Sequence, residues 1–234
     1  MSLLAYLDWL LLPATIITFL LAQQLQKRLH HPLANALLWS MLLWVAILLV
    51  SGISFTRYFE VTHWLSDLLQ PAVVALGVPL FRQLKAMRRH LPVLIGTTLL
   101  SSFCGLLTAV GLGLLFGLES QLVAAFAPRS VTTPVAVEIA TSLQAPLPLA
   151  ALAVIVTGLF GAIFGLPLLQ RLGIKDKRAQ GVAMGAASHA LGTARCAEVS
   201  PVLAAYSALA MVLCALFTTL LAPYLVPWLI RLGS

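Results

Sequence analysis

Charged residues are scarce in this sequence. Lys, Arg, Asp and Glu together make up 9% of the 234 residues, whereas 61% of the residues are hydrophobic. A soluble domain typically has about 25% charged and about 45–50% apolar residues. A soluble chain of this length has no interior large enough to bury so much apolar surface. The composition therefore excludes an ordinary soluble domain and predicts a protein whose apolar surface faces lipid.

Cysteine pairs and catalytic motifs are also lacking. Cys104, Cys196 and Cys214 form no CxxC pair and have no metal-ligand spacing with histidine, so we expect no disulfide, no metal and no cofactor. The sequence has no phosphate loop, no G-x-S-x-G, no H-E-x-x-H and no Rossmann glycine set. These absences predict a protein that is not an enzyme. The net charge of +7 does not indicate nucleic-acid binding, because the basic residues fall in short connections between apolar runs.

Long hydrophobic runs are what the sequence has in abundance. Crossing a bilayer takes about 20 apolar residues, and six runs approach or exceed that length. They span residues 3–22, 33–52, 64–81, 91–117, 147–169 and 202–229. We therefore predict an all-α membrane protein, a polytopic helical bundle of about six full spans. We expect one transmembrane domain over residues 1–234, with the first run retained as a span, not cleaved as a signal peptide.

The basic residues predict how the chain is oriented. Ten of the fourteen lie in three connections, at 23–32, 82–90 and 171–178. The positive-inside rule makes these connections cytoplasmic. The N-terminus and a loop at 51–63 then lie outside, and we expect the membrane to be a bacterial inner membrane.

Two polar segments interrupt the apolar pattern. The runs 91–117 and 147–169 already take the chain out from the cytoplasmic connection at 82–90 and back to the one at 171–178. The segment 118–146 between them must therefore enter and leave on the outer side or break within the membrane. The segment 179–200 is rich in small and polar residues. Backbone of this kind is tolerated at membrane depth only inside protein or beside a watery cavity. We therefore predict two broken or re-entrant segments.

The second polar segment carries the most distinctive candidate residues. They are Ser188, His189, Gly192, Thr193 and Arg195. A half-helix ending near Gly192 would leave amides free, and an arginine pairs with both oxygens of a carboxylate, so the segment predicts an anion cradle. Charged residues inside a membrane are usually functional. Alternatively, Arg195 forms a structural ion pair with Glu198 or Glu138, and Arg129 is a further candidate for an ion pair. His189 is either a proton relay or a hydrogen-bonded core histidine.

Two further segments are candidates for the same site. Thr132, Thr133 and Pro134 form a helix-start signal next to Arg129, which fits either a helix beginning inside the membrane or an ordinary capped helix in an outer loop. Gln70 and Pro71 interrupt an apolar run. The string Ala-Val-Val that follows Pro71 resembles the string Val-Ala-Val that follows Pro134. Paired Pro-interrupted segments in two halves indicate an inverted repeat and a transporter binding site. Such strings also arise by chance in this composition. We predict that all three segments converge on one cavity.

Three strings of the sequence carry a resemblance to a known family. They are LLQPAVVALGVPL at 68–80, PRSVTTPV at 128–135 and AMGAASHALGTARCAE at 183–198. In order and spacing they resemble the LrgB/CidB family over nearly the whole chain. The resemblance implies a holin-like or antiholin-like regulator of murein hydrolase activity and autolysis, working with a small LrgA/CidA-type membrane partner. Some bacterial relatives are linked to pyruvate movement. Plant relatives, which carry a fused LrgA-like part that this chain lacks, exchange glycolate and glycerate across the plastid envelope.

Two hypotheses for the function follow. The first is a carrier of small 2-hydroxy or 2-oxo monocarboxylates such as glycolate, glycerate, lactate or pyruvate. The second is a holin-like assembly that regulates murein hydrolases without a substrate of its own. Polar groups inside the membrane favour the carrier, because a structural assembly gains nothing from the cost of placing them there. The expected partners are a carboxylate substrate, the lipid bilayer, an LrgA/CidA-like protein and a second copy of the chain in a dimer.

Overall fold

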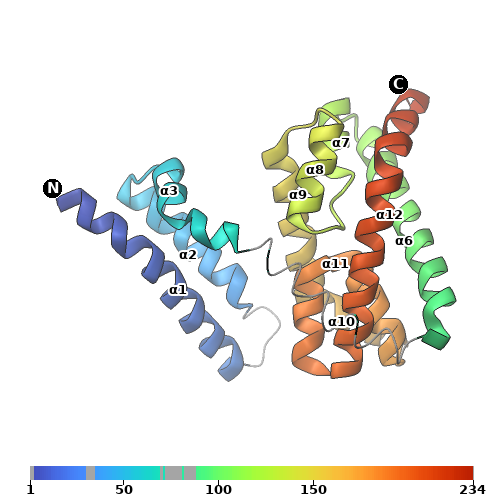
Figure 1. Ribbon diagram of the computed structural model, residues 1–234, viewed down its shortest axis with the longest axis horizontal. Coiled ribbons are helices and arrows are strands. Elements are labelled where there is room, and N and C mark those ends of the chain that lie inside the picture. Colours follow the sequence, from blue (N-terminus) through green and yellow to red (C-terminus); the bar gives the residue numbers. More distant parts are fainter. Residues whose placement is uncertain (1–2, 30–34, 69–70, 72–80, 82–87, 234) are drawn as a thin grey trace. The chain divides into compact units, whose positions relative to one another are not determined.

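All the regular structure in the described part of the chain is helical. The computed structural model describes residues 3–29, 35–68, 71, 81 and 88–233, and no strand occurs among them (Figure 1). This confirms the all-α prediction. The chain divides into two compact units, Met1–Pro79 and Leu80–Ser234. Each unit is described by itself.

The first unit contains three helices, α1 (Leu3–Leu29), α2 (Ala36–Ser51) and α3 (Phe55–Asp67). The side chain of Asn35 accepts a hydrogen bond of 3.1 Å from the amide of Leu38, and so caps the start of α2. Gly52 ends α2 in the left-handed conformation that glycine adopts without steric cost. The indole of Trp44 donates a hydrogen bond of 2.8 Å to Thr18, which ties α2 to α1.

The helix α3 differs from the prediction, which placed an outer loop at 51–63. Its aromatic residues explain the difference. The ring of Tyr58 lies 5.0 Å from that of Trp44, and the Tyr58 hydroxyl shares a hydrogen bond of 3.0 Å with Thr15. These contacts give α3 a face that packs on α1 and α2, so the segment is an amphipathic helix and not a loop.

Four of the six predicted crossings are long apolar helices. The described residues contain candidate spans at Trp9–Leu29, Arg88–Leu115, Leu147–Arg171 and Pro201–Gly233, and a shorter apolar helix at Ala36–Ser51. Most of the predicted run 64–81 lies outside the described residues. These helices make the chain a multi-pass membrane protein.

Three of these helices frame the second unit. They are α6 (Leu91–Leu115), α12 (Pro201–Gly233) and a continuous helix made of α9 (Leu147–Phe160), the π-helical turn η2 (Gly161–Gly165) and α10 (Leu166–Arg171). α6 and α12 are joined across their contact by polar groups. Ser102 donates a hydrogen bond of 3.3 Å to the carbonyl of Cys214, and the Cys214 thiol donates one to the carbonyl of Thr98.

The segment 118–146 forms a helical hairpin made of α7 (Ser120–Phe126) and α8 (Thr133–Ser142). α7 runs back along α6, because a Cβ atom on Gly113 would lie 2.9 Å from Val123, and Arg129 hydrogen-bonds to Gly105 further along the same helix. α8 then returns: Leu143 at its end lines the same cavity as Ser120 at the start of α7. The segment enters and leaves at one end of the unit, as predicted (Figure 1).

The segment 177–199 forms a second hairpin, labelled α11 (Lys177–Val199), which breaks at His189. A Cβ atom on Gly192 would lie 2.9 Å from the carbonyl oxygen of Met184, whereas residues eight apart in a straight helix are about 12 Å apart. The chain therefore folds back at the break. A Cβ atom on Gly181 would meet the carbonyl of Leu203, so α12 begins at the same end as α11.

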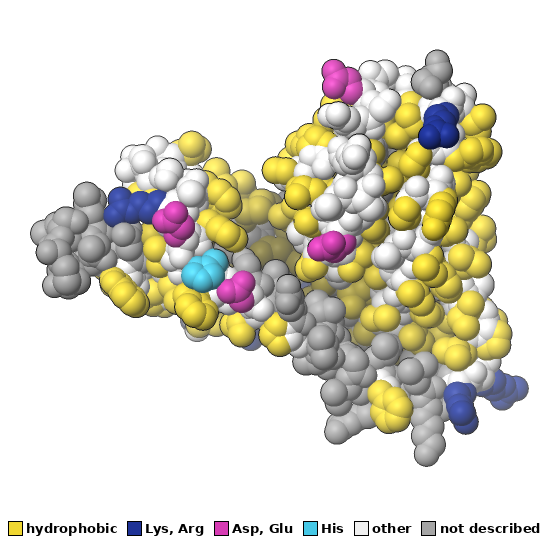
Figure 2. Space-filling view, turned by 45° about the horizontal axis from the view of Figure 1, so that its top comes forward, with side chains coloured by type: hydrophobic (Ala, Val, Ile, Leu, Met, Phe, Trp, Pro, Cys, Tyr) yellow, Lys and Arg dark blue, Asp and Glu magenta, His cyan; other side chains and the backbone are white. Residues whose placement is uncertain are grey.

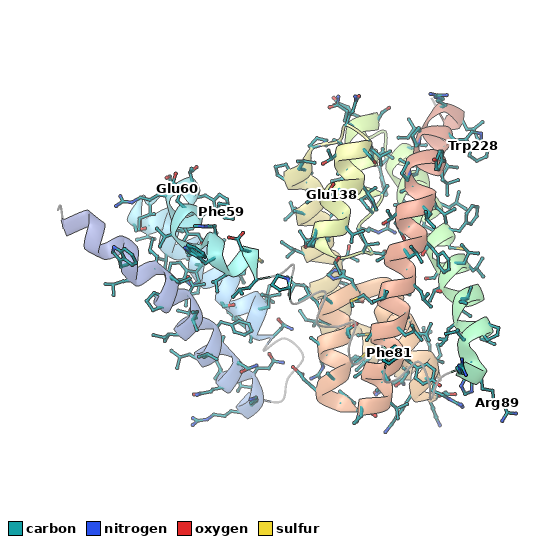
Figure 3. All side chains as sticks on the ribbon, in the orientation of Figure 1. Phe59, Glu60, Phe81, Arg89, Glu138 and Trp228 are labelled. Carbon is teal, nitrogen blue, oxygen red and sulfur yellow. The ribbon has the colours of Figure 1, made fainter. Side chains whose placement is uncertain are left out.

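The two hairpins enter from opposite ends of the second unit. Arg178, at the start of α11, lies 3.4 Å from the His90 ring at the start of α6. Arg89 and Trp228 lie at opposite ends of the unit in Figure 3. On the face of the second unit that Figure 2 shows, the side chains between these ends are mainly hydrophobic, and the visible Lys and Arg side chains lie near the ends. Two of the basic connections used to predict the topology thus share one end, as that prediction requires.

Candidate functional site

The tips of the two hairpins reach similar depths in the second unit. Arg129, in the first tip, bonds to the carbonyl of Gly105, the fifteenth of the 25 residues of α6. His189, in the second tip, bonds to the carbonyl of Val154, the eighth of the 25 residues of the span Leu147–Arg171. Because these two helices run in opposite directions, both contacts lie somewhat beyond the midpoint measured from the basic end.

The second tip packs against a row of glycines on α9 and η2. A Cβ atom on Gly158 would lie 2.5 Å from the His189 ring, and one on Gly165 would lie 2.5 Å from the Met184 sulfur. A Cβ atom on Gly161 would collide with the side chain of Ser188. The glycines therefore allow the tip to approach the helix closely. The π-helical turn at this contact is a distortion frequent at functional sites.

His189 has an unusual backbone and an unusual environment. Its φ of 40° and ψ of −134° lie in a region that residues with side chains rarely adopt. The side chain is 3% exposed, and its Nε2 lies 2.9 Å from the carbonyl oxygen of Val154. A carbonyl only accepts, so Nε2 carries the proton in this contact. Nδ1 is buried and has no hydrogen-bond partner. Backbone strain of this kind, held by its surroundings, is concentrated at functional sites.

The other polar residues of this segment are divided between the tip and the second limb of the hairpin. Ser188 is buried, and Gly192 packs on Met184 and Ser188. The Thr193 hydroxyl donates to the carbonyl of His189 and shares a hydrogen bond of 2.8 Å with Ser207 of α12. These contacts hold the break closed against α12.

Arg195 does not lie with them. Its guanidinium donates a hydrogen bond of 2.6 Å to Glu198, and its side chain is 34% exposed. The alternative of an ion pair with Glu198 matches this arrangement, and the anion cradle that includes Arg195 stays a prediction. The reason is helical spacing: residues three apart lie on one face, and this limb of α11 turns that face outward.

Arg129 is the basic residue of the first tip. Its Nη1 donates to the carbonyl of Gly105 and its Nη2 to the hydroxyl of Thr108, both at 3.3 Å. Both acceptors are neutral. Among the residues that the structure describes, no carboxylate lies within ion-pair distance of this guanidinium. Thr132 is the N-cap residue of α8 without a side-chain cap bond, and Thr133 and Pro134 begin the helix. Glu138 is exposed on α8 (Figure 3).

A small chamber lies between the first tip and the second hairpin. Ala127 and Ser130 of the first tip and Ala186 of α11 line it together with residues of α6 and α12. Its hydroxyl-bearing residues are Ser101, Ser102, Ser130 and Thr218. Its volume of about 10 Å³ is about the least that can hold one water molecule. The chamber is therefore a small, partly open space with four hydroxyl-bearing residues in its lining.

A larger groove leads from the basic end of the unit towards the chamber. It has a volume of about 510 Å³ between α6, α11 and α12, and it shares Ser101 and Ala186 with the chamber. At its mouth the Tyr206 hydroxyl shares a hydrogen bond of 3.2 Å with His90. Asp176 caps α11, and the hydrogen bond from the Arg178 side chain lowers the pKa of its carboxyl group.

Of the three segments predicted to converge on one cavity, the structure describes two together, those around Thr132 and Ser188. The chamber brings Ser130, within two residues of Thr132, near Ala186, within two residues of Ser188. Gln70 lies outside the described residues, and Pro71 belongs to the first unit. The serine and threonine hydroxyls on α6 and α12 were missed. Paired Ser101 and Ser102 inside an apolar run were the signal that could have revealed them.

Comparison with known proteins adds a family to this geometry. The model of the LrgB-like family matches residues 15–228. The chain is 35% identical over 219 residues to an uncharacterized protein of Haemophilus influenzae, covering 94% of this chain and 95% of the relative. It is 30% identical over 217 residues to a protein of Staphylococcus epidermidis named holin-like protein CidB, covering 93% and 95% of the two chains.

A second uncharacterized relative, YxaC of Bacillus subtilis, is 33% identical over 218 residues, covering 93% of this chain and 94% of the relative. No solved structure matches the chain. The family model covers both hairpins, two of the four long apolar helices in full and most of the other two. The chain is therefore a multi-pass membrane protein that belongs to the LrgB-like family.

Proposed function

We propose that this chain is a carrier of small 2-hydroxy or 2-oxo monocarboxylates across a bacterial inner membrane. One observation carries the proposal: two hairpins enter the second unit from opposite ends, and residues at or near their tips line one small chamber that also has hydroxyl-bearing residues in its wall. Broken helices that meet near the midplane are how many transporters build a substrate site. An assembly without a substrate has no need of polar groups at this depth, where they are costly.

Uptake into proteoliposomes tests the carrier. The purified chain, reconstituted alone, is expected to accumulate radiolabelled glycolate or pyruvate with saturable kinetics, and excess unlabelled substrate should suppress the signal. Liposomes containing a denatured sample of the same chain are the control. Uptake no faster than in the control, for glycolate, glycerate, lactate and pyruvate alike, would remove the carrier function.

A second candidate function is a holin-like one, and the names of the relatives favour it more directly than they favour the carrier. Proteins of Staphylococcus epidermidis and Staphylococcus aureus named holin-like protein CidB are 30% and 28% identical over 217 residues. In this function the chain works with a small LrgA/CidA-type membrane partner to regulate murein hydrolases. Deleting the gene is then expected to change the rate of detergent-induced autolysis several-fold, and restoring the gene should reverse the change.

The two functions differ in what crosses the membrane. A carrier saturates with substrate and excludes larger solutes. A holin-like assembly would release an entrapped dye as well as small acids, with a rate that rises steeply with the number of chains per vesicle. Dye retention during saturable glycolate uptake would exclude the holin-like function for the chain alone.

A further inference from the structure

The geometry points to Arg129, with the chamber beside it, as the binding site for the carboxylate group of a small anion. The inference rests on the carrier function proposed above and names the residue that recognises the substrate. Arg129 lies in the first hairpin tip, and its guanidinium reaches Gly105, a residue of the chamber wall. Ser130, the next residue, supplies a hydroxyl to the chamber.

The state of the charge is the first argument. A guanidinium has five N–H donors, and Arg129 has hydrogen bonds to two neutral acceptors, the carbonyl of Gly105 and the hydroxyl of Thr108. Nothing within ion-pair distance among the described residues neutralises it. A cation held partly buried at this depth is costly unless it has an anionic partner. A substrate carboxylate supplies that partner, and two parallel hydrogen bonds match its two oxygens.

Comparison with Arg195 is the second argument. Arg195 already has a carboxylate at 2.6 Å, that of Glu198. A substrate would have to displace Glu198 before binding there. At Arg129 the substrate carboxylate would replace only neutral hydrogen-bond acceptors, which bind a guanidinium less strongly than a carboxylate does. Neither arginine lines the chamber itself, but Arg129 bonds to Gly105, which does.

The surroundings of Arg129 are the third argument. The ten-residue helix α8 begins at Thr133, four residues after Arg129, and its N-cap Thr132 makes no side-chain cap bond. The amino end of a helix carries partial positive charge that favours an anion. Ser102 and Thr218 line the same chamber, and serine and threonine hydroxyls are suited to the 2-hydroxy or 2-oxo group of the proposed substrates.

The size of the chamber limits what can bind. At about 10 Å³ it admits no more than a water molecule, so an anion must widen it. The groove of about 510 Å³ shares Ser101 and Ala186 with it and provides the approach from the basic end. The break at His189, three residues beyond Ala186, is the place where the second hairpin can move.

Direct binding tests the site without depending on transport. Sodium glycolate and sodium pyruvate are titrated calorimetrically into the purified full-length chain in detergent, with uncharged glycolamide as the control ligand. We expect both anions to bind and glycolamide not to bind. Arg129→Gln should weaken binding at least tenfold. Arg129→Lys, which keeps the charge but not the two-pronged geometry, should weaken it less.

Two other arginines complete the design. Arg171→Gln, at the exposed end of α10, is the matched control and should bind as the wild type does. Arg195→Gln is the competing variant: loss of binding there, with binding retained in Arg129→Gln, would overturn the proposal. If Arg129→Gln does not purify as a single species, then Arg129→Lys and Ser130→Ala decide, and wild-type affinity in both would overturn it. A wild-type chain that binds neither anion would overturn it as well.

Failure of the site and failure of the carrier give different results. Wild-type uptake that Arg129→Gln leaves unchanged would remove the site and keep the carrier. Binding that depends on Arg129, without uptake by the wild type, would keep the site and remove the carrier.

Discussion

Close packing at single glycines is the first residue-scale feature that can be tested. Gly161→Ala places a methyl group against the side chain of Ser188, and overpacking of this kind costs about 1–3 kcal/mol. We expect the apparent Tm in detergent, measured by intrinsic fluorescence, to fall by several degrees. Gly111→Ala on α6 is the control, because a Cβ there meets nothing within 4 Å and alanine favours a helix. Equal Tm values for the two variants would contradict the contact.

The backbone of His189 provides a second residue-scale prediction. Alanine is normally more stable than glycine within a helix, by about 1 kcal/mol. At φ 40° and ψ −134° the order should reverse, because glycine adopts this conformation without strain. Both variants lose the hydrogen bond to Val154, so their difference isolates the backbone. We expect His189→Gly to unfold at a higher temperature than His189→Ala. The opposite order would mean that α11 is a continuous helix.

At the scale of elements, the α11 hairpin predicts that both of its ends lie on the same side of the membrane. Cysteines introduced at Lys175 and Glu198, in a chain whose native cysteines are replaced, should react with a membrane-impermeant thiol reagent from one and the same side. A cysteine at Glu119, at the start of the other hairpin, should react from the opposite side. Labelling of positions 175 and 198 from different sides would show that 177–199 crosses the membrane.

At the scale of the whole molecule, the charge distribution predicts which side is which. The basic end of the second unit should face the cytoplasm, and α12 runs from that end to the other. The C-terminus should therefore lie outside. Alkaline phosphatase fused after Ser234 should be active, and green fluorescent protein fused there should be dark. Fluorescence of the green fluorescent protein fusion would place the C-terminus in the cytoplasm. That result would contradict the predicted orientation, including the outside N-terminus. The single transmembrane domain and the dimer stay predictions.

The sequence by itself determined the membrane class, the helical fold and the existence of two broken segments. These follow from local composition: long apolar runs must cross, and segments as rich in polar residues as 118–146 and 179–200 interrupt the apolar pattern. The basic connections also predicted that Arg89 and Arg178 share one end, and Arg178 lies 3.4 Å from His90 beside it. Helix ends were less accurate, and the aromatic contacts of Tyr58 turned an expected loop into α3.

The tertiary structure alone decided where each polar residue lies. The ion pair of Arg195 with Glu198 follows from helical spacing and was one of the alternatives that the sequence offered. No local pattern, in contrast, reveals that Arg129 meets only neutral acceptors on α6. The fold-back at His189 depends on glycines of α9 and η2, more than twenty residues earlier in the chain. Partners and cavities are set by contacts between helices that are distant in sequence, and periodicity within one helix does not encode them.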